Sequence, residues 1–199
     1  MEVVGFHGTE SSAKISVAKY GLDPQRTMHR KDHWLGQGVY FFIDEGKAMW
    51  WASSVADKKN TYPIIYRVII SGDESVVLNL DDPFQFAEFL DNSINMVMRK
   101  PVEDAENTAN VDIILDSKIF RCVLFDCYKD MYHKDIIIGT FEKDCVRYAG
   151  IIQEEERLKI QKDIVRKLQI SFRETQICVS NKSCIKSIIL YYDGEDEVV

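Results

Sequence analysis

The chain has 199 residues, of which 46% are hydrophobic, and its formal net charge at pH 7 is -7. This length and composition fit one domain with a hydrophobic core, so we expect a single domain over residues 1–199. The acidic balance argues against a broadly basic nucleic-acid-binding surface, although it is compatible with a local basic groove.

The cysteine pattern predicts neither a disulfide framework nor a zinc site. The number of cysteines is odd, and no two of them have C-x-x-C spacing. The five are Cys122, Cys127, Cys145, Cys178 and Cys184. We expect buried thiols in a reducing cytoplasm and no bound metal. No stretch approaches the roughly 20 apolar residues of a membrane span, and the start of the chain leaves no room for a signal peptide. We therefore expect a soluble, cytoplasmic protein without membrane contact.

The first part of the chain predicts a strand, a helix and a polar loop. Val3–His7 has the pattern of a short buried strand, and Ser11–Tyr20 that of a helix ended by Gly21. Ser11 or Ser12 is expected to cap this helix. The following loop, Leu22–His33, carries a group of basic side chains: Arg26, His29, Arg30, Lys31 and His33.

A strand, a helix and two further strands are predicted next. The strand is Val39–Phe42, and the helix is Asp44–Ala56. Helical spacing places Ala48, Trp51, Ala52 and Val55 on one apolar face of this helix. The β-branched segment Tyr62–Ile70 and the shorter Val76–Leu80 are expected to be strands.

Helices are expected to dominate the middle of the chain. Pro83–Met98 is predicted to be a helix with Pro83 at its first position, and Asn107–Tyr132 is also predicted to be helical. Together they suggest a helical insertion around residues 80–134. Asp135–Phe141 returns to a strand, and Gln153–Gln169 has the pattern of an amphipathic surface helix.

Two strands are expected near the end, followed by a frayed acidic tail. They are Thr175–Val179 and Ile185–Tyr192, and the tail is Gly194–Val199. The whole order predicts an α+β fold in which the first and last strands belong to one sheet.

Two segments combine apolar residues, glycines and a single polar side chain in a way that a purely structural strand does not need. They are Gly5–Thr9, with His7 and Gly8, and Gly36–Phe42, with Tyr40. Glycine lets a backbone approach a ligand closely, and the His or Tyr then has a group to face.

These segments resemble the first two signature strands of the diphtheria-toxin-like and poly(ADP-ribose)-polymerase-like ADP-ribosyltransferases. The resemblance implies mixed or antiparallel sheets around an NAD cleft, with NAD as a consumed cosubstrate. It implies that the backbone of Gly8, beside Thr9, receives the nicotinamide amide, and that His7 bonds the adenosine-side ribose. It also implies that Tyr40 stacks on the cationic nicotinamide ring, an interaction of about 0.5–2 kcal/mol.

The resemblance also implies a second aromatic side chain on the other face of that ring, shortly after the second strand. Trp50 and Trp51 both stand there, in Ala48-Met49-Trp50-Trp51. Because Trp51 is expected on the apolar helix face, we favour Trp50.

The third signature, an acid near the start of the penultimate strand, is where this sequence departs from the family pattern. The distance to the closing strand places the catalytic position on Gln176, and the acid stands two residues earlier, at Glu174. Residues i and i+2 of a strand share a face, so both are expected to face the cleft. Glutamine can hold a hydroxyl but cannot take a proton, which favours single-unit transfer with Glu174 as the base. Glu142 is a weaker substitute for this role.

The basic loop has two interpretations, a solvated loop or a phosphate-binding segment. In the second, Arg26 and Arg30 contact the pyrophosphate of NAD or a nucleic-acid backbone.

The expected function is an NAD-dependent mono-ADP-ribosyltransferase without a metal. It resembles small bacterial toxins and anti-phage effectors that modify a nucleic acid, with RNA favoured over DNA, and that are paired with an antitoxin protein. The alternatives are a transferase acting on a protein or a small molecule, or a catalytically weak module that binds NAD or ADP-ribose.

Overall fold

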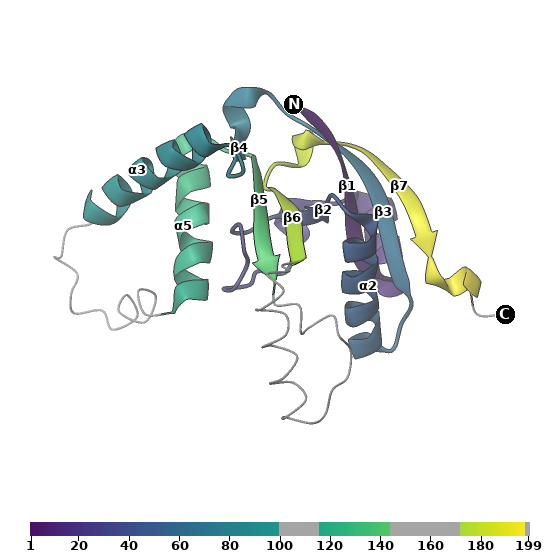
Figure 1. Cartoon of the computed structure of the whole chain (residues 1–199). Helices are drawn as coiled ribbons and strands as arrows, with labels where there is room; N and C mark the ends of the chain where they lie inside the picture. Colours follow the sequence, from purple (N-terminus) through teal and green to yellow (C-terminus); the bar gives the residue numbers. More distant parts are fainter. Residues whose placement is uncertain (100–115, 144–171, 198–199) are drawn as a thin grey trace, which may run out of the picture.

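The computed structural model describes residues 1–99, 116–143 and 172–197. These form an α+β fold around a seven-stranded mixed sheet with the order β4-β5-β6-β2-β1-β3-β7 (Figure 1). The strands are β1 Glu2–Glu10, β2 Val39–Phe42, β3 Pro63–Ser71, β4 Val77–Asn79, β5 Ile136–Lys143, β6 Phe172–Val179 and β7 Ile185–Asp193. β4 pairs with β5 in parallel, and the other described pairs are antiparallel.

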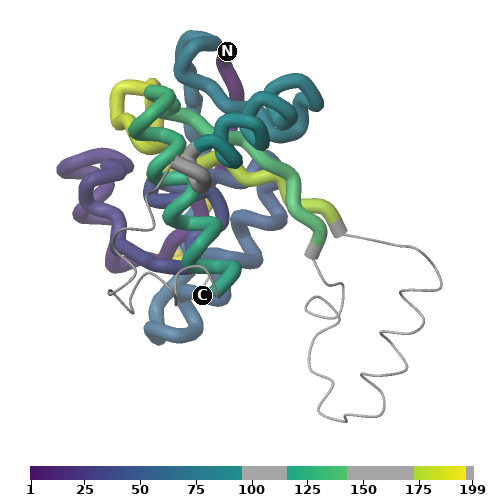
Figure 2. Tube along the Cα trace, turned by 90° about the vertical axis from the view of Figure 1, so that its left-hand side faces the viewer, coloured from purple at the N-terminus to yellow at the C-terminus, as the bar shows by residue number. Residues whose placement is uncertain are grey.

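The sheet consists of two well-paired halves joined by a narrow junction. In one half, β1 pairs with β3 along its whole length, from Glu2 opposite Ser71 to Glu10 opposite Pro63, and β7 continues this half. In the other half, β6 lies between β2 and β5, and Figures 1 and 2 both show β5 and β6 side by side. β1 and β2 are joined by the single described pair Phe6–Phe42. The halves therefore separate on either side of this pair.

Two groups of helices cover one face of the sheet. α2 (Glu45–Lys59) packs on β1 and β3 through the buried alanines Ala48, Ala52 and Ala56. α5 (Ser117–Tyr132) and α3 (Pro83–Arg99) cover the β5–β6 half, where Phe89, Phe125 and Tyr128 pack over Ile137 and Cys178. α1 (Lys14–Tyr20) and Leu22 cover the opposite face of the sheet.

Close packing of α2 on β1 depends on a glycine. A Cβ atom at Gly8 would lie 2.2 Å from the main-chain oxygen of Ala48, so no larger residue fits there without moving the helix. The helix itself begins where the Asp44 side chain accepts a hydrogen bond from the main-chain N–H of Lys47, and it ends at Asn60 in the left-handed conformation (φ 53°).

The sequence predicted the α+β class, and the first and last strands do share one sheet. Two local predictions were wrong. The first helical turn, at Ser11–Ala13, is capped by the side chain of Glu10, which accepts the main-chain N–H of Ser12, and not by Ser11 or Ser12. Trp51 is 37% exposed, and the buried face of α2 repeats every four residues through small alanines.

Some predictions fall partly or wholly outside the described residues: the helix Gln153–Gln169, residues 107–115 of the helix expected at Asn107–Tyr132, and the state of Cys145. The described part of that second helix is α5. Of the remaining cysteines, Cys122, Cys178 and Cys184 are buried free thiols, and Cys127 is partly buried.

Candidate functional site

The three segments that the sequence singled out lie on neighbouring strands. His7 and Gly8 are on β1, Tyr40 is on β2, and Glu174 and Gln176 are on β6; these are adjacent in the sheet order (Figure 1). His7 and Tyr40 are 33 positions apart in the chain, and Tyr40 and Glu174 are 134 apart. The junction between the two halves of the sheet therefore lies among them.

Cross-strand pairing fixes which of these side chains share a face. Tyr40 is opposite Cys178 and Phe42 is opposite Gln176, so Tyr40, Gln176 and Glu174 lie on one face. Gly8 lies on the same face, against α2. His7 points to the opposite face, where its ring centre is 5.8 Å from that of Phe41. Thr9, two residues later, shares the face of His7.

The His7 ring bridges the junction between β1 and β2. Its Nδ1 atom lies 2.8 Å from the main-chain oxygen of Tyr40. A carbonyl oxygen can only accept, so Nδ1 carries the proton, and Nε2 of the neutral ring is an acceptor. Burial lowers the pKa of His7, and the bond to Tyr40 opposes this only in part. The ring is therefore neutral near pH 7 and can accept a hydrogen bond from a hydroxyl group at Nε2.

Glu174 and Gln176 form a buried polar pair near the start of β6. Their exposed fractions are 2% and 6%, and the Gln176 amide donates a hydrogen bond to Oε1 of Glu174. Both side chains lie on the same face of β6, as the alternation of a strand requires. The main-chain N–H of Ile43 bonds to Thr175, so Glu174 lies just beyond the end of β2, where the chain turns into α2. Such a position places a carboxylate in a largely desolvated setting, where its charge acts strongly on a bound group.

Glu142 is not brought to this pair. Phe141 stands directly opposite Glu174, so Glu142, the next residue of β5, lies on the other face. Its side chain is 69% exposed and lies 4.0 Å from Arg173. The structure therefore favours Glu174 over Glu142 as the acid on the face of Tyr40.

The Tyr40 hydroxyl holds the loop that precedes β2. It donates to the main-chain oxygen of Gly36 and accepts from the main-chain N–H of Leu35, both at 2.7 Å. Leu35 is fully buried, and the ring of His33 lies 5.1 Å from that of Tyr40. Burial raises the pKa of Tyr40 far above its ordinary value, so the phenol is neutral. In this structure the Tyr40 hydroxyl therefore supports the loop that precedes β2.

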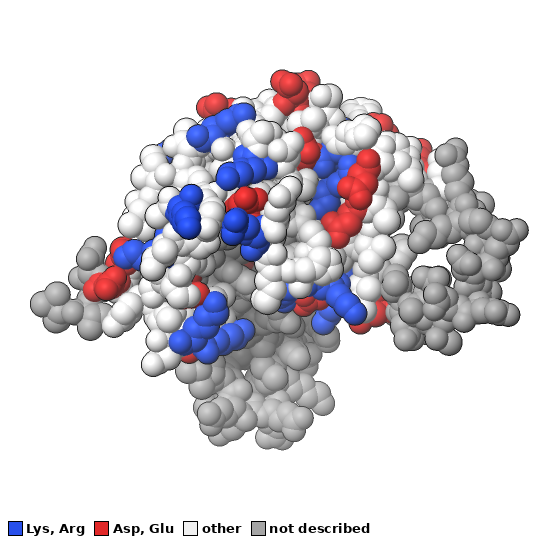
Figure 3. All heavy atoms as spheres, turned by 180° about the vertical axis from the view of Figure 1, so that it is seen from behind, with Lys and Arg blue, Asp and Glu red and all other residues white. Residues whose placement is uncertain are grey.

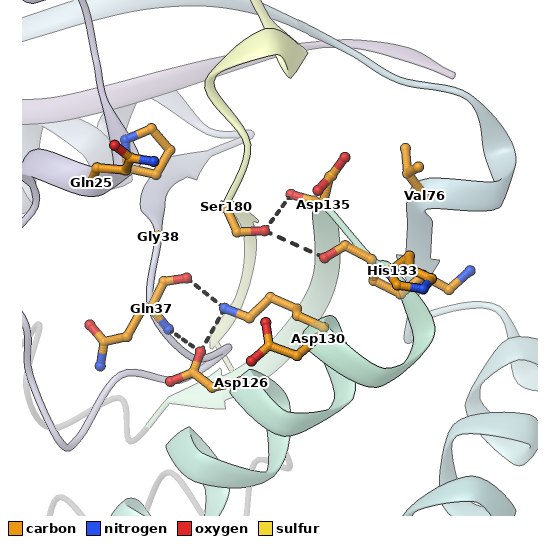
Figure 4. Close-up of a pocket in the computed structure, with 12 residues that line it drawn as sticks. Gln25, Gln37, Gly38, Val76, Asp126, Asp130, His133, Asp135 and Ser180 are labelled. Atoms are coloured by element: carbon orange, nitrogen blue, oxygen red, sulfur yellow. Dashed lines mark hydrogen bonds and ion pairs between the residues drawn. The ribbon is translucent and has the colours of Figure 1, made fainter.

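Two residues of α5 complete this support, and the sequence gave no signal for either. Asp126 accepts from the main-chain N–H of Gln37 at 2.6 Å, and the buried Lys129 donates to the Gln37 oxygen at 2.5 Å and pairs with Asp126 at 2.8 Å (Figure 4). A buried lysine in a helix of mixed polarity is recognisable only once its partners are known.

An open pocket of about 690 Å³ adjoins this network. It lies at the Gly38 and Ser180 ends of β2 and β6, which is the opposite end of these strands from Glu174 (Figure 4). Ser180 follows Glu174 by six positions along the extended chain, a separation of about 20 Å. The pocket's lysine and carboxylate at Lys129 and Asp126 bond to one another and to the main chain, so we assign it no ligand.

The remaining candidates have the following surroundings. Arg30 makes a two-pronged ion pair with Asp32, at 3.0 and 2.9 Å, and the Arg26 guanidinium lies 3.6 Å from the Tyr20 ring centre. Trp50 is 36% exposed on α2. On the face opposite α2, Lys and Arg side chains alternate with Asp and Glu and do not form one continuous basic surface (Figure 3).

Within the described ranges, no helix has both the length and the apolar character needed to cross a membrane. The same residues contain no cluster of three or more His, Cys, Asp or Glu side chains arranged to hold a metal ion. Comparisons with protein-family models, curated proteins and solved structures gave no match.

Proposed function

We propose that this chain is an NAD-dependent mono-ADP-ribosyltransferase. The observation that carries the proposal is the placement of His7–Gly8, Tyr40 and Glu174–Gln176 on three adjacent strands, around the junction where β1 and β2 separate. In the sequence these are three distant segments, and the resemblance to ADP-ribosyltransferases requires them to meet.

The reaction assigns tasks to the two polar groups on β6. The bond between the ribose C1′ and the nicotinamide nitrogen breaks, its electron pair leaves with neutral nicotinamide, and the ribose develops oxocarbenium character. The carboxylate of Glu174 stabilises this positive charge. The acceptor's lone pair then forms a bond to C1′, and its proton passes to Glu174. Gln176 orients Glu174. The His7 ring lies on the opposite face of the sheet, so we assign it no part in this step.

The proposed acceptor is a nucleic acid, with RNA favoured, and the proposed role is that of a cytoplasmic toxin or anti-phage effector held in check by an antitoxin protein. The basic loop that carries Arg26 and Arg30, and the resemblance to toxins of this class, support this choice. A second candidate is a module that binds NAD or ADP-ribose with little transfer. This candidate is favoured because Gln176, an amide, lies opposite Phe42. The acid, Glu174, stands two residues earlier on the same strand.

The test uses NAD labelled on its adenylate phosphate, incubated with the protein and a cell lysate that is then divided between nuclease and protease. Label that nuclease removes identifies a nucleic-acid acceptor, and label that only protease removes identifies a protein. Intact NAD with no macromolecular label would support the binding module.

A pair of matched variants tests the assigned base. Glu174→Gln should reduce transfer by about 100-fold or more, because it removes the charge that stabilises the transition state, while NAD affinity changes little. Glu88→Gln, the same change at an exposed position of α3, is the control and should keep full activity. Full activity in Glu174→Gln would show that Glu174 is not the base.

A further inference from the structure

Three side chains form an aromatic and cationic cluster on the face of the sheet that carries Glu174. The rings of Trp34 and Phe141 meet edge to face with centres 4.6 Å apart. The guanidinium carbon of Arg121, on α5, lies 4.2 Å from the centre of the Trp34 ring. We call Trp34, Arg121 and Phe141 the stacking cluster.

The stacking cluster begins next to the proposed catalytic acid. Phe141 and Glu174 are direct partners in the antiparallel pair β5–β6 and share one face. The Cβ atoms of such partners are about 4.5–5.5 Å apart. A planar group resting on the cluster would therefore lie beside the carboxylate.

The loop that presents Trp34 is held in place on both sides. Leu35 is fully buried, and the Tyr40 hydroxyl bonds to the main chain of Leu35 and Gly36. Asp126 and Lys129 fix Gln37. The position of Trp34 is thus set before any ligand arrives, which lowers the entropic cost of binding one.

Two buried nitrogen atoms flank Trp34 in this region. Nε of Arg121 and Nδ1 of His33 are buried and have no hydrogen-bond partner among the described residues. Burial also lowers the pKa of Arg121. A buried polar nitrogen without a partner is costly, so a ligand that supplies polar partner atoms here would relieve that cost.

We propose that the stacking cluster receives an unpaired base of a single-stranded nucleic-acid acceptor and holds it beside Glu174. This inference rests on the proposed function and names the acceptor's subsite. Unpaired bases stack on aromatic rings and on planar guanidinium groups, and the adjoining phosphates favour a nearby cation. The nicotinamide ring of NAD does not fit as well, because it is cationic and Arg121 repels it.

The first experiment measures binding directly and does not depend on catalysis. A fluorescein-labelled, short single-stranded RNA of mixed sequence is titrated with the protein and followed by fluorescence anisotropy. Trp34→Ala and Arg121→Lys should each weaken binding at least about fivefold, since stacking on one base contributes at least that much. Arg121→Lys keeps the charge and loses only the planar group. Trp51→Ala and Lys58→Gln, at exposed positions of α2, are the matched controls and should bind like the parent protein.

The second experiment reports contact with Trp34 itself. The chain has three tryptophans, so the double variant Trp50→Phe, Trp51→Phe leaves Trp34 as the only indole emitter. A base stacked on the cluster should quench this emission as RNA is added. A tryptophan that only supports the loop would show no such quenching.

The outcomes separate this inference from the proposed function. Nicotinamide release from NAD without any acceptor is measured on the parent protein. RNA binding that depends on Trp34, without nicotinamide release from the parent protein, would support the cluster and refute the transferase. Nicotinamide release without RNA binding would refute the proposed base-binding role of the cluster but not the transferase. The same conclusion would follow if RNA affinity were unchanged in Trp34→Ala and RNA did not quench the Trp34 emission.

Discussion

The carboxylate of Glu10, at the end of β1, is predicted to make the stability of this protein depend strongly on acidity below pH 4.5. Its side chain is only 3% exposed. One oxygen accepts from Lys59 at 2.8 Å and from the Ser12 hydroxyl at 2.7 Å, and the other accepts from the main-chain N–H of Ser12 at 2.7 Å. Burial raises the pKa of Glu10, but these bonds outweigh it and lower the pKa to about 2.

The size of the effect follows from the two pKa values. The gap between the ordinary value of 4.5 and a value of about 2 corresponds to about 3 kcal/mol, at about 1.4 kcal/mol for each pH unit. Because Lys59 is 57% exposed, solvent screens part of its attraction, and we expect about 2 kcal/mol. A carboxylate with a lowered pKa stabilises the fold fully above pH 4.5. That contribution is lost as the pH falls from 4.5 towards 2.

The assay is urea unfolding of the parent protein and of Glu10→Gln across this pH range. At pH 7 the variant should be less stable by about 2 kcal/mol, and the two free energies of unfolding should converge as the pH falls from 4.5 to 2. Glu2→Gln, at the exposed start of the same strand, is the control. Equal stability of Glu10→Gln and the parent protein at pH 7, with parallel curves at lower pH, would refute the reasoning.

Two further substitutions test the packing and the loop support around the site. Gly8→Ala places a Cβ atom 2.2 Å from the Ala48 main-chain oxygen. We expect a loss of about 2–3 kcal/mol in the free energy of unfolding, measured by urea denaturation. An unchanged value would mean that α2 moves freely over β1. Tyr40→Phe removes the two hydrogen bonds to Leu35 and Gly36. We expect the free energy of unfolding to fall by about 1–3 kcal/mol and the amide hydrogen of Leu35 to exchange faster. Unchanged exchange would show that the hydroxyl does not hold the loop.

Strands built from β-branched residues were predictable because their composition and their turns act locally. The strand expected at Tyr62–Ile70 is β3, Pro63–Ser71, and the one expected at Ile185–Tyr192 is β7, Ile185–Asp193. The cap at the first helical turn was not predictable in this way. Propensity favours serine at such positions, whereas Glu10 is held there by Lys59, which is 49 residues away.

The buried face of α2 shows a second limit of periodicity. The apolar spacing favoured a face that included Trp51, but the observed face is Ala48, Ala52 and Ala56. A helix that packs directly over a glycine of a strand needs small side chains, and the sequence of the helix alone does not show that Gly8 lies beneath it. Likewise, Lys129 looks like a surface lysine until the Gln37 oxygen is placed beside it.

The three motifs of the candidate site could be found in the sequence. Only the strand pairing shows which side chains lie on the same face of the sheet. β6 is paired on both sides, with Gln176 opposite Phe42 on β2 and opposite Gly139 on β5, so its register is fixed twice. A shift of one residue would turn both polar groups away from the face of Tyr40.

Because Glu174 and Gln176 share one face of β6, the amide at position 176 can bond directly to the acid at position 174. Two carboxylates at hydrogen-bonding distance repel each other and tend to share one proton, which would weaken the negative charge that the proposed reaction requires. The Gln176 amide donates to Glu174 instead, so it orients the carboxylate without opposing its charge. The pair is therefore best understood as one acid with its positioning partner, in which the charge and the neighbouring amide occupy alternate positions of a single strand face.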